Sequence, residues 1–268
     1  MDRVPLLAGV MGAAMFVAAA SPAAEIASHR ASYTLSLGTA RSNSGIAAIE
    51  GAMFIEWQEV CDGWTISQRM KFQMIDSDGE KLENDISFSS WEGRDGQSYR
   101  FTLRSSRDGE VSETLRGRAQ LDGIGKSGKA SFTEPEGLEL DLPVGTIFPT
   151  EHTLLLIRSA EANERQISRM VFDGATQDGA LEINAIMGPT LPVRPDAGTK
   201  INPELGQRPG WRTRMAFFKA DAAGGAPEYE TSLILHNNVV GRDYTFEYPE
   251  FTIKSRLDLL EPLPKPRC

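Results

Sequence analysis

Cysteine, histidine and long apolar runs are all scarce in this chain of 268 residues. The three histidines, His29, His152 and His236, lie far apart and lack the spacing of metal ligands. No Gly-x-Ser-x-Gly nucleophile motif occurs, and the many carboxylates single out no pair for acid–base catalysis. The sequence therefore names no catalytic, metal-binding or cofactor-binding residue, and we expect no cofactor.

Two segments resemble ligand-binding loops but lack the context that those loops require. Residues 123–129 read Gly-Ile-Gly-Lys-Ser-Gly-Lys, close to a phosphate-binding loop, which must lead into a helix. Strand-like residues follow instead, and Ala130 offers no hydroxyl for magnesium. Residues 76–80 resemble part of a calcium loop without its full ligand pattern. We interpret both segments as hairpin connections.

Positive charge is also in deficit, and the formal net charge is −9. An acidic chain disfavours binding to nucleic acid and adhesion to anionic lipid headgroups through a basic patch. We therefore expect no nucleic-acid partner, and we interpret the acidity as a solubility feature.

The one long apolar run lies at residues 4–20, and a Ser-Pro-Ala-Ala stretch ends it. This pattern is typical of a secretory signal peptide cleaved near Ala23 or Ala24. A membrane anchor is the alternative, but the run is near the lower length limit for spanning and is rich in small residues. We expect a signal peptide at residues 1–24 and an exported single domain at residues 25–268 without an integral membrane segment.

The two cysteines are Cys61 and Cys268, the last residue. Two cysteines in an exported protein favour a disulfide, whereas two unrelated free thiols are the alternative. Cys268 ends a proline-rich tail, residues 261–267, which we expect to form neither helix nor central strand. Such a tail frays unless its end is held, so a bond from Cys61 would act as a clasp.

Turn signals and alternating residues predict an antiparallel sheet. Asp-Gly, a pair suited to type I′ hairpin turns, recurs through the chain, and strand-like runs lie between the pairs. In residues 64–75, Ile66, Met70 and Phe72 fall on one face and polar side chains on the other. Strict alternation indicates strands with one buried and one solvated face.

The alternation stops at one place, where residues 150–164 form the only convincing helix. Residues 188–210, rich in proline and glycine, are interpreted as a long loop within the domain. Further strands are predicted at residues 29–38, 168–172, 180–187, 211–219, 229–236, 242–248 and 251–259.

About a dozen strands exceed a comfortable open sheet, which must then curl, close or split. We predict an all-β, mainly antiparallel fold: a long curled, spiral-like open sheet or half-barrel with one helix on its concave face. A concavity of this kind is the usual setting for a ligand or partner. The tryptophans Trp57, Trp64, Trp91 and Trp211 either line a glycan or lipid groove or, more commonly, pack in the core.

Several motifs together resemble a known family. They are the opening His29-Arg30-Ala31 segment with alternating Tyr33, Leu35 and Leu37, then Gly51, the Cys61-Asp62-Gly63-Trp64 element, the Phe148-Pro149-Thr150-Glu151-His152 segment and the terminal cysteine. The chain resembles the cell-envelope integrity protein EipB family of Gram-negative bacteria over essentially its whole exported length. The resemblance implies a periplasmic β-spiral protein, a Cys61–Cys268 disulfide and a role in envelope integrity under stress. It also implies a shape similar to the half-barrels that carry lipoproteins across the periplasm.

We therefore hypothesise a non-enzymatic, monomeric periplasmic protein that supports the envelope. It would bind a lipid, a lipoprotein-like ligand or a protein partner on its concave face. Two rival hypotheses are a hydrolase or lyase acting on envelope glycan, which requires paired acids in a cleft, and a pure protein-interaction scaffold.

Overall fold

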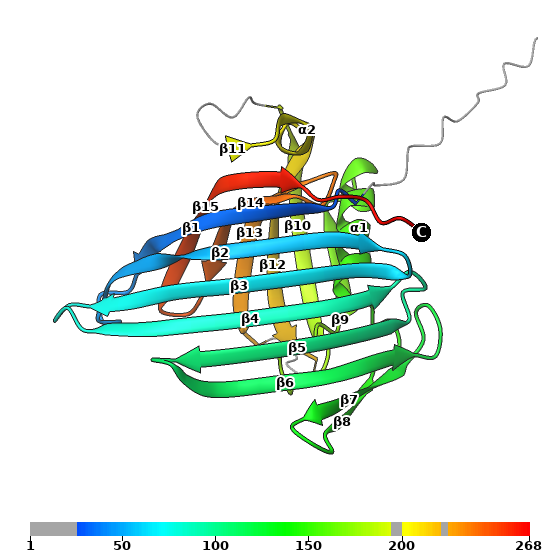
Figure 1. Ribbon diagram of the computed structural model, residues 1–268, viewed down its shortest axis with the longest axis horizontal. Coiled ribbons are helices and arrows are strands. Elements are labelled where there is room, and N and C mark those ends of the chain that lie inside the picture. Colours follow the sequence, from blue (N-terminus) through cyan, green and yellow to red (C-terminus); the bar gives the residue numbers. More distant parts are fainter. Residues whose placement is uncertain (1–25, 194–199, 221–224) are drawn as a thin grey trace, which may run out of the picture.

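One large antiparallel sheet dominates the computed structural model, which describes residues 26–193, 200–220 and 225–268 (Figure 1). The predicted signal peptide lies outside the described residues. The helices are α1 (Pro149–Glu161) and α2 (Pro203–Gly206), and no described helix is long and apolar enough to cross a membrane. The strands are β1 (His29–Ala40), β2 (Ile46–Val60), β3 (Gly63–Asp76), β4 (Lys81–Gly93), β5 (Ser98–Arg107), β6 (Glu110–Leu121), β7 (Gly128–Glu134), β8 (Glu139–Leu142), β9 (Gln166–Val171), β10 (Leu181–Leu191), β11 (Lys200–Ile201), β12 (Gly210–Lys219), β13 (Tyr229–His236), β14 (Gly241–Glu247) and β15 (Phe251–Pro262).

Strands that follow one another in sequence are mostly neighbours in space. The order is β8-β7-β6-β5-β4-β3-β2-β1-β15-β14-β13-β12-β10-β9, and the short β11 pairs with β15. The first and last long strands, β1 and β15, pair in the middle of this path and join the two meanders. The fold therefore needs its C-terminal strand in place to become one continuous sheet.

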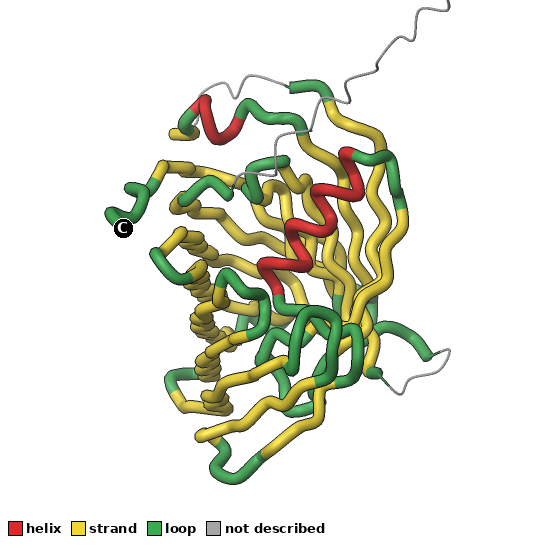
Figure 2. The backbone as a smooth tube through the Cα atoms, turned by 90° about the vertical axis from the view of Figure 1, so that its right-hand side faces the viewer, coloured by secondary structure: helices red, strands yellow, loops and turns green. Residues whose placement is uncertain are grey.

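The sheet curls around α1 without closing. Figure 2 shows α1 between the two walls of the curl. The end strands β8 and β9 do not pair with each other. Instead Ile147, which follows β8, forms a parallel bridge with Val171, and Phe172 N donates to Ile147 O at 3.1 Å. The predicted fold class, a curled open antiparallel sheet with a helix on its concave side, is confirmed.

The alternation read from the sequence separates the two faces of the sheet. In β3, Met70 and Phe72 are buried, whereas the intervening Arg69 and Lys71 are exposed. We call the side that faces α1 the inner face and the other side the outer face. The inner face carries the core because every second residue of each long strand points into the curl.

Only one of the Asp-Gly pairs forms the expected type I′ turn. Asp108 and Gly109, with φ of 50° and 81°, make the two-residue connection between β5 and β6. Elsewhere, as at Asp78-Gly79, the glycine alone has positive φ, because longer connections use other turn types. At Asp62-Gly63 the turn is Cys61-Asp62, and Gly63 begins β3, where an added Cβ would collide with the Glu92 carbonyl oxygen.

Three predicted segments outside the strands have the wrong bounds or content. The helix begins one residue earlier, at Pro149, which the first turn of a helix tolerates, and it ends at Glu161. The supposed loop 188–210 contains the end of β10, β11 and the short α2, whose N-cap Asn202 accepts from Glu204 N. The supposed tail begins as strand, because β15 continues to Pro262 opposite His29. A proline is tolerated there because it is the last residue of the strand.

Gly174 lies where a side chain has no room. Its φ is +70°, and an added Cβ would overlap the ring of Phe101, itself packed at 5.0–5.5 Å between centroids against Phe132 and Phe172. Gly179, in the same connection, has φ of +92° but nothing within 4 Å.

These two glycines give a matched pair of variants. We expect Gly174→Ala to lower the free energy of unfolding by about 3 kcal/mol, from backbone strain plus overpacking. Gly179→Ala should cost only about 1 kcal/mol, from strain alone. Urea denaturation of the two variants measures the difference, and equal losses would contradict the packing described for Phe101.

Candidate functional site

Apolar side chains that are only half-buried collect on the inner face at one end of the sheet. This is the end where β1 turns into β2, β3 into β4 and β14 into β15, at the left of Figure 1. We call these side chains the inner rim: Leu37, Ile46, Met74, Phe246 and Phe251. They pack against the buried core on one side and leave part of their surface to solvent on the other.

Strand register places the rim directly on the core. Leu37 and Phe246 both lie opposite the fully buried Ile253, and Met74 lies opposite the buried Ile49. The ring of Phe246 stacks on Tyr244 with centroids 5.8 Å apart. The rim is therefore supported by ordered strands rather than by loops, which favours a preformed binding surface.

Tyrosines anchor this side of the core. The ring of Tyr244 meets that of Tyr33 edge-on at 5.5 Å, and Tyr33 Oη donates to Gly241 O at 2.7 Å. Burial raises the pKa of Tyr33 well above its ordinary value, and it raises the pKa of Tyr244 to about 12. Both phenols are therefore neutral at physiological pH and add no charge beneath the rim.

The opposite end of the sheet carries the disulfide. Cys61 and Cys268 are bonded, with Cα atoms 5.6 Å apart across a sequence separation of 207 residues. Leu263 N donates to Ser28 O at 2.9 Å, so the tail leaves β15 alongside the start of β1. The bond holds the C-terminus to the turn between β2 and β3. This role is structural, because the sulfurs sit far along the strands from the inner rim.

A buried carboxylate holds the start of α1. Glu92 of β4 points inward with 2% exposure, and its two oxygens accept from Thr150 N at 2.7 Å and Glu151 N at 3.1 Å. Two backbone donors of the first helical turn are thereby satisfied by a residue from a distant strand. Burial raises the pKa of Glu92 to about 7, although the two N–H donors oppose that shift.

The other perturbed groups in the interior also have packing roles. Burial raises the pKa of Asp173, whose Oδ1 accepts from Ala175 N at 2.9 Å. Burial lowers the pKa of His152 on α1 to about 4, so its ring is neutral at physiological pH. Burial is the main cause of the raised pKa values of Glu92 and Asp173, and backbone N–H groups occupy both carboxyls, so neither value requires a catalytic pair. The described residues hold no group of three or more metal-ligating side chains that could bind an ion.

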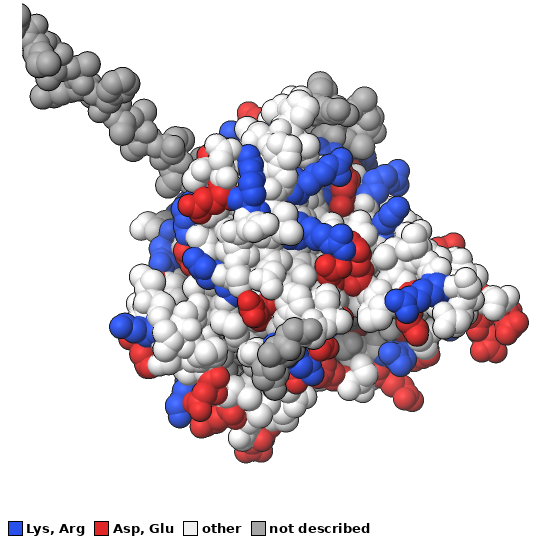
Figure 3. Space-filling view, turned by 180° about the vertical axis from the view of Figure 1, so that it is seen from behind, with Lys and Arg blue, Asp and Glu red and all other residues white. Residues whose placement is uncertain are grey.

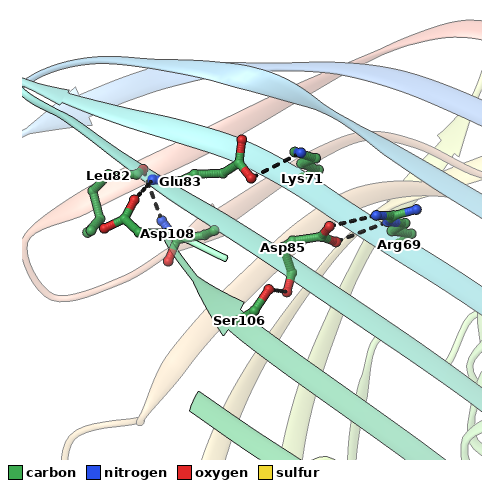
Figure 4. Close-up of polar contacts among 8 residues, drawn as sticks. Arg69, Lys71, Leu82, Glu83, Asp85, Ser106 and Asp108 are labelled. Carbon is green, nitrogen blue, oxygen red and sulfur yellow. Dashed lines mark hydrogen bonds and ion pairs between the residues drawn. The ribbon is translucent and has the colours of Figure 1, made fainter. Parts of the chain in front are cut away.

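On most of the outer face, charges are neutralised by cross-strand pairs. Arg69 of β3 makes a bidentate contact with Asp85 of β4, at 3.0 and 2.6 Å, and Lys71 pairs with Glu83 at 3.0 Å (Figure 4). The guanidinium lowers the pKa of Asp85. The face opposite to that of Figure 1 also carries basic and acidic side chains in mixture (Figure 3). Such pairs explain how so many charges coexist on one sheet.

The tryptophans divide between the core and the surface. Trp57 and Trp211 are buried beside α1, as the core interpretation expects. Trp64 and Trp91 are only partly buried, at the same end of the sheet as the disulfide. None of the four belongs to the inner rim.

Reasoning from sequence missed the rim and Glu92. The rim residues read as ordinary members of alternating strands, and only the curl shows that their end of the sheet is less covered. For Glu92 the sequence does contain a signal. Alternation along β4 places this acidic residue at a position that faces the core, directly after the outward-facing Trp91.

A curled, incomplete antiparallel barrel with an internal helix is the fold of a β-barrel-like protein. Sequence comparison identifies the family within this class of proteins. The chain belongs to the EipB-like family, which matches residues 20–264. It is 29% identical over 271 residues to the cell envelope integrity protein EipB of Brucella abortus (strain 2308), covering 97% of this chain and 95% of that protein. A crystal structure of a β-barrel-like protein of domain of unknown function DUF1849 from Brucella abortus superposes with a TM-score of 0.81. The two sequences are 28% identical, and the superposition covers 90% of this chain and 99% of the chain in that crystal structure.

The comparisons confirm the family resemblance found in the motifs. Family membership supports a role in cell-envelope integrity and a location at the cell envelope.

Proposed function

We propose that this protein supports the envelope from the periplasm, as a monomer, by binding an acyl chain of a lipid or lipoprotein on the inner rim. One observation supports the proposal. The rim is a group of half-buried apolar side chains on the inner face of the sheet, all packed against the same buried core. Covering such a surface with an acyl chain removes further apolar area from water, at roughly 25 cal/mol per Å².

The protein acts by binding, in this proposal, and the chemistry of the rim agrees with that. The five side chains of the rim have no titratable group, so the surface offers contact area without a nucleophile or proton donor. The rival glycan hydrolase needs paired acids in a cleft, whereas the raised pKa values of Glu92 and Asp173 belong to side chains that bind backbone N–H groups. Crosslinking experiments distinguish the remaining alternative, a protein-interaction scaffold, from an acyl-chain site.

A fluorescent fatty acid titrated into the protein, purified without detergent, tests the proposal. We expect saturable binding with an enhanced signal in the wild-type protein. Phe251→Ser should weaken it about tenfold, because a half-buried aromatic ring contributes on the order of 1–2 kcal/mol when a ligand completes its burial. Met74→Gln should act in the same direction.

Phe54→Ser is the matched control, because Phe54 is an apolar residue 51% exposed on the outer face of β2. Its affinity for the fatty acid should equal that of the wild type. Absence of binding to the wild-type protein, or equal losses in Phe54→Ser and Phe251→Ser, would rule out the rim as an acyl-chain site. Crosslinking of the rim to a protein instead would favour the scaffold.

A further inference from the structure

A shallow depression lies on the outer face, away from the inner rim. It has a volume of about 760 Å³ and spans β3 to β7 near the disulfide end of the sheet. Hydroxyl groups contribute much of its polar lining, from Thr65, Ser67, Ser89, Thr102, Ser131 and Thr133. Three arginines and one tryptophan also line it, beside apolar groups such as Ile66 and Phe101, so the charged and hydroxyl groups distinguish this surface from the apolar rim.

Strand register sets the central side chains in a row across the sheet. Trp91 of β4 lies opposite Arg100 of β5, Arg100 lies opposite Arg118 of β6, and Arg118 lies opposite Ser131 of β7. All four face outward, and both arginines are exposed. Neighbouring strands are about 4.8 Å apart, so the row presents one functional group at each step of that length.

The two arginines have no acidic partner among the described residues. Neither Arg100 nor Arg118 forms an ion pair with any residue that the structure describes, although each is directly opposite the other. Like charges in that position destabilise a sheet. Elsewhere on the same face Arg69 pairs with Asp85 and Arg30 with Glu56. Arg104 of β5 also forms no ion pair with a described residue, but only Arg100 and Arg118 among these bases lie directly opposite each other, in a chain of net charge −9.

Trp91 orients the guanidinium group of Arg100 without neutralising its charge. Its Nε1 donates to Asp62 Oδ1 at 3.2 Å, which fixes the indole ring. The guanidinium of Arg100 lies over that ring, 4.5 Å from the centroid. A cation–π contact orients the guanidinium but leaves its N–H donors available for an anion.

Basic residues at the margin are only loosely paired. Arg116 lies 3.7 Å from Glu134, and Lys129 lies 3.8 Å from Asp141, with all four side chains well exposed. Exposed pairs at these distances contribute little, so an incoming anion displaces the carboxylates at small cost. The positive charge of the depression therefore extends beyond the central row.

From this geometry we propose that the depression binds an acidic glycan, a carbohydrate chain that carries carboxylate groups. Guanidinium forks bind carboxylates in bidentate fashion, serine and threonine hydroxyls match sugar hydroxyls, and the row repeats at a step close to that of successive sugar rings. A flat bilayer contacts protruding surfaces, whereas these side chains line a hollow. The site is independent of the acyl-chain site, because it lies on the other face of the sheet.

Calorimetric titration of the purified protein with oligogalacturonate tests the proposal. We expect saturable binding that weakens as salt is raised, since exposed charges are screened. The double variant Arg100→Gln/Arg118→Gln should bind about tenfold or more weakly, because charge-assisted hydrogen bonds are lost. Its melting temperature should not fall, because the substitution removes a like-charge pair.

The matched control is Arg30→Gln/Arg69→Gln, which removes the same charge from the same face at positions paired with acids. It should retain wild-type affinity for oligogalacturonate, and neutral dextran should not bind to any variant. No binding by the wild-type protein, or equal losses in both double variants, would overturn the proposal. Binding of phosphatidylglycerol vesicles or inorganic phosphate in place of oligogalacturonate would overturn it as well and would identify a different anion.

Discussion

Replacing Cys268 with serine should lower the melting temperature of the oxidised protein by about 10 °C or more. The disulfide closes a loop across 207 residues, for which the chain-entropy model gives about 5 kcal/mol. For a domain of this size each kcal/mol shifts the melting temperature by about 2–4 °C. Part of the full entropic value is lost because real unfolded chains retain structure. Calorimetry or circular dichroism melting of wild type and variant measures the shift.

The loss of stability should arise where β15 pairs with β1. Losing the bond releases the tail that follows β15, the strand that joins the two meanders by pairing with β1. Cys61→Ser and the double variant should therefore melt at the same temperature as Cys268→Ser, and reductant should bring the wild type to that temperature. If reduction leaves the wild-type melting temperature unchanged, the bond does not stabilise the fold.

The second large effect is expected at Glu92. Glu92→Ala leaves the Thr150 and Glu151 N–H groups at the buried start of α1 without their acceptor. Stranding buried donors costs about 1–3 kcal/mol each, so we expect a loss of about 3 kcal/mol in the free energy of unfolding. Glu139→Gln, which changes an exposed acid on β8, should remain within about 0.5 kcal/mol of wild type.

The same residue makes stability depend on pH in a predictable direction. Burial raises the pKa of Glu92 from 4.5 to about 7, so the folded state keeps its proton where the unfolded chain has already released it. Stability contributed by this group is full below pH 4.5, falls as pH rises through the window from 4.5 to about 7, and is constant above it. The total change is about 3 kcal/mol.

Glu92→Gln cannot ionise and isolates this contribution. The free energy of unfolding of wild type minus that of Glu92→Gln should decrease by about 3 kcal/mol between pH 4.5 and pH 8. Urea denaturation across that range measures it. A difference that stays constant with pH would show that folding leaves the pKa of Glu92 unchanged, and one that increases would show that folding lowers it; either result would contradict the prediction.

Much of the fold follows from local patterns in the sequence. Alternation in β3 places Met70 and Phe72 inside and Arg69 and Lys71 outside, because the strand period leaves no other choice once one face is buried. The number of such strands implies a curl, and the break at Pro149 marks the helix. The register of β1 against β15 was not predictable, because it joins residues more than 200 positions apart and no local signal specifies it.

The candidate sites follow the same division. The outward positions of Arg100 and Arg118 are readable from alternation, but their pairing depends on the register between β5 and β6. Glu92 looks misplaced in sequence because its partners, Thr150 and Glu151, are almost 60 residues away. The Asp-Gly pairs predict where the turns lie but not which type of turn forms. The length of each connection decides whether Asp-Gly adopts a type I′ turn.

An acyl chain bound on the inner rim can be located by crosslinking. The experiment uses a fatty acid with a photoreactive group at the end of its chain, crosslinked to the wild-type protein and mapped by peptide mass spectrometry. We predict crosslinks in the peptides that contain Met74, Phe246 and Phe251, and their loss when unlabelled fatty acid competes. Crosslinks confined to the outer face around Phe54, or label that unlabelled fatty acid does not displace, would contradict acyl-chain binding on the inner rim.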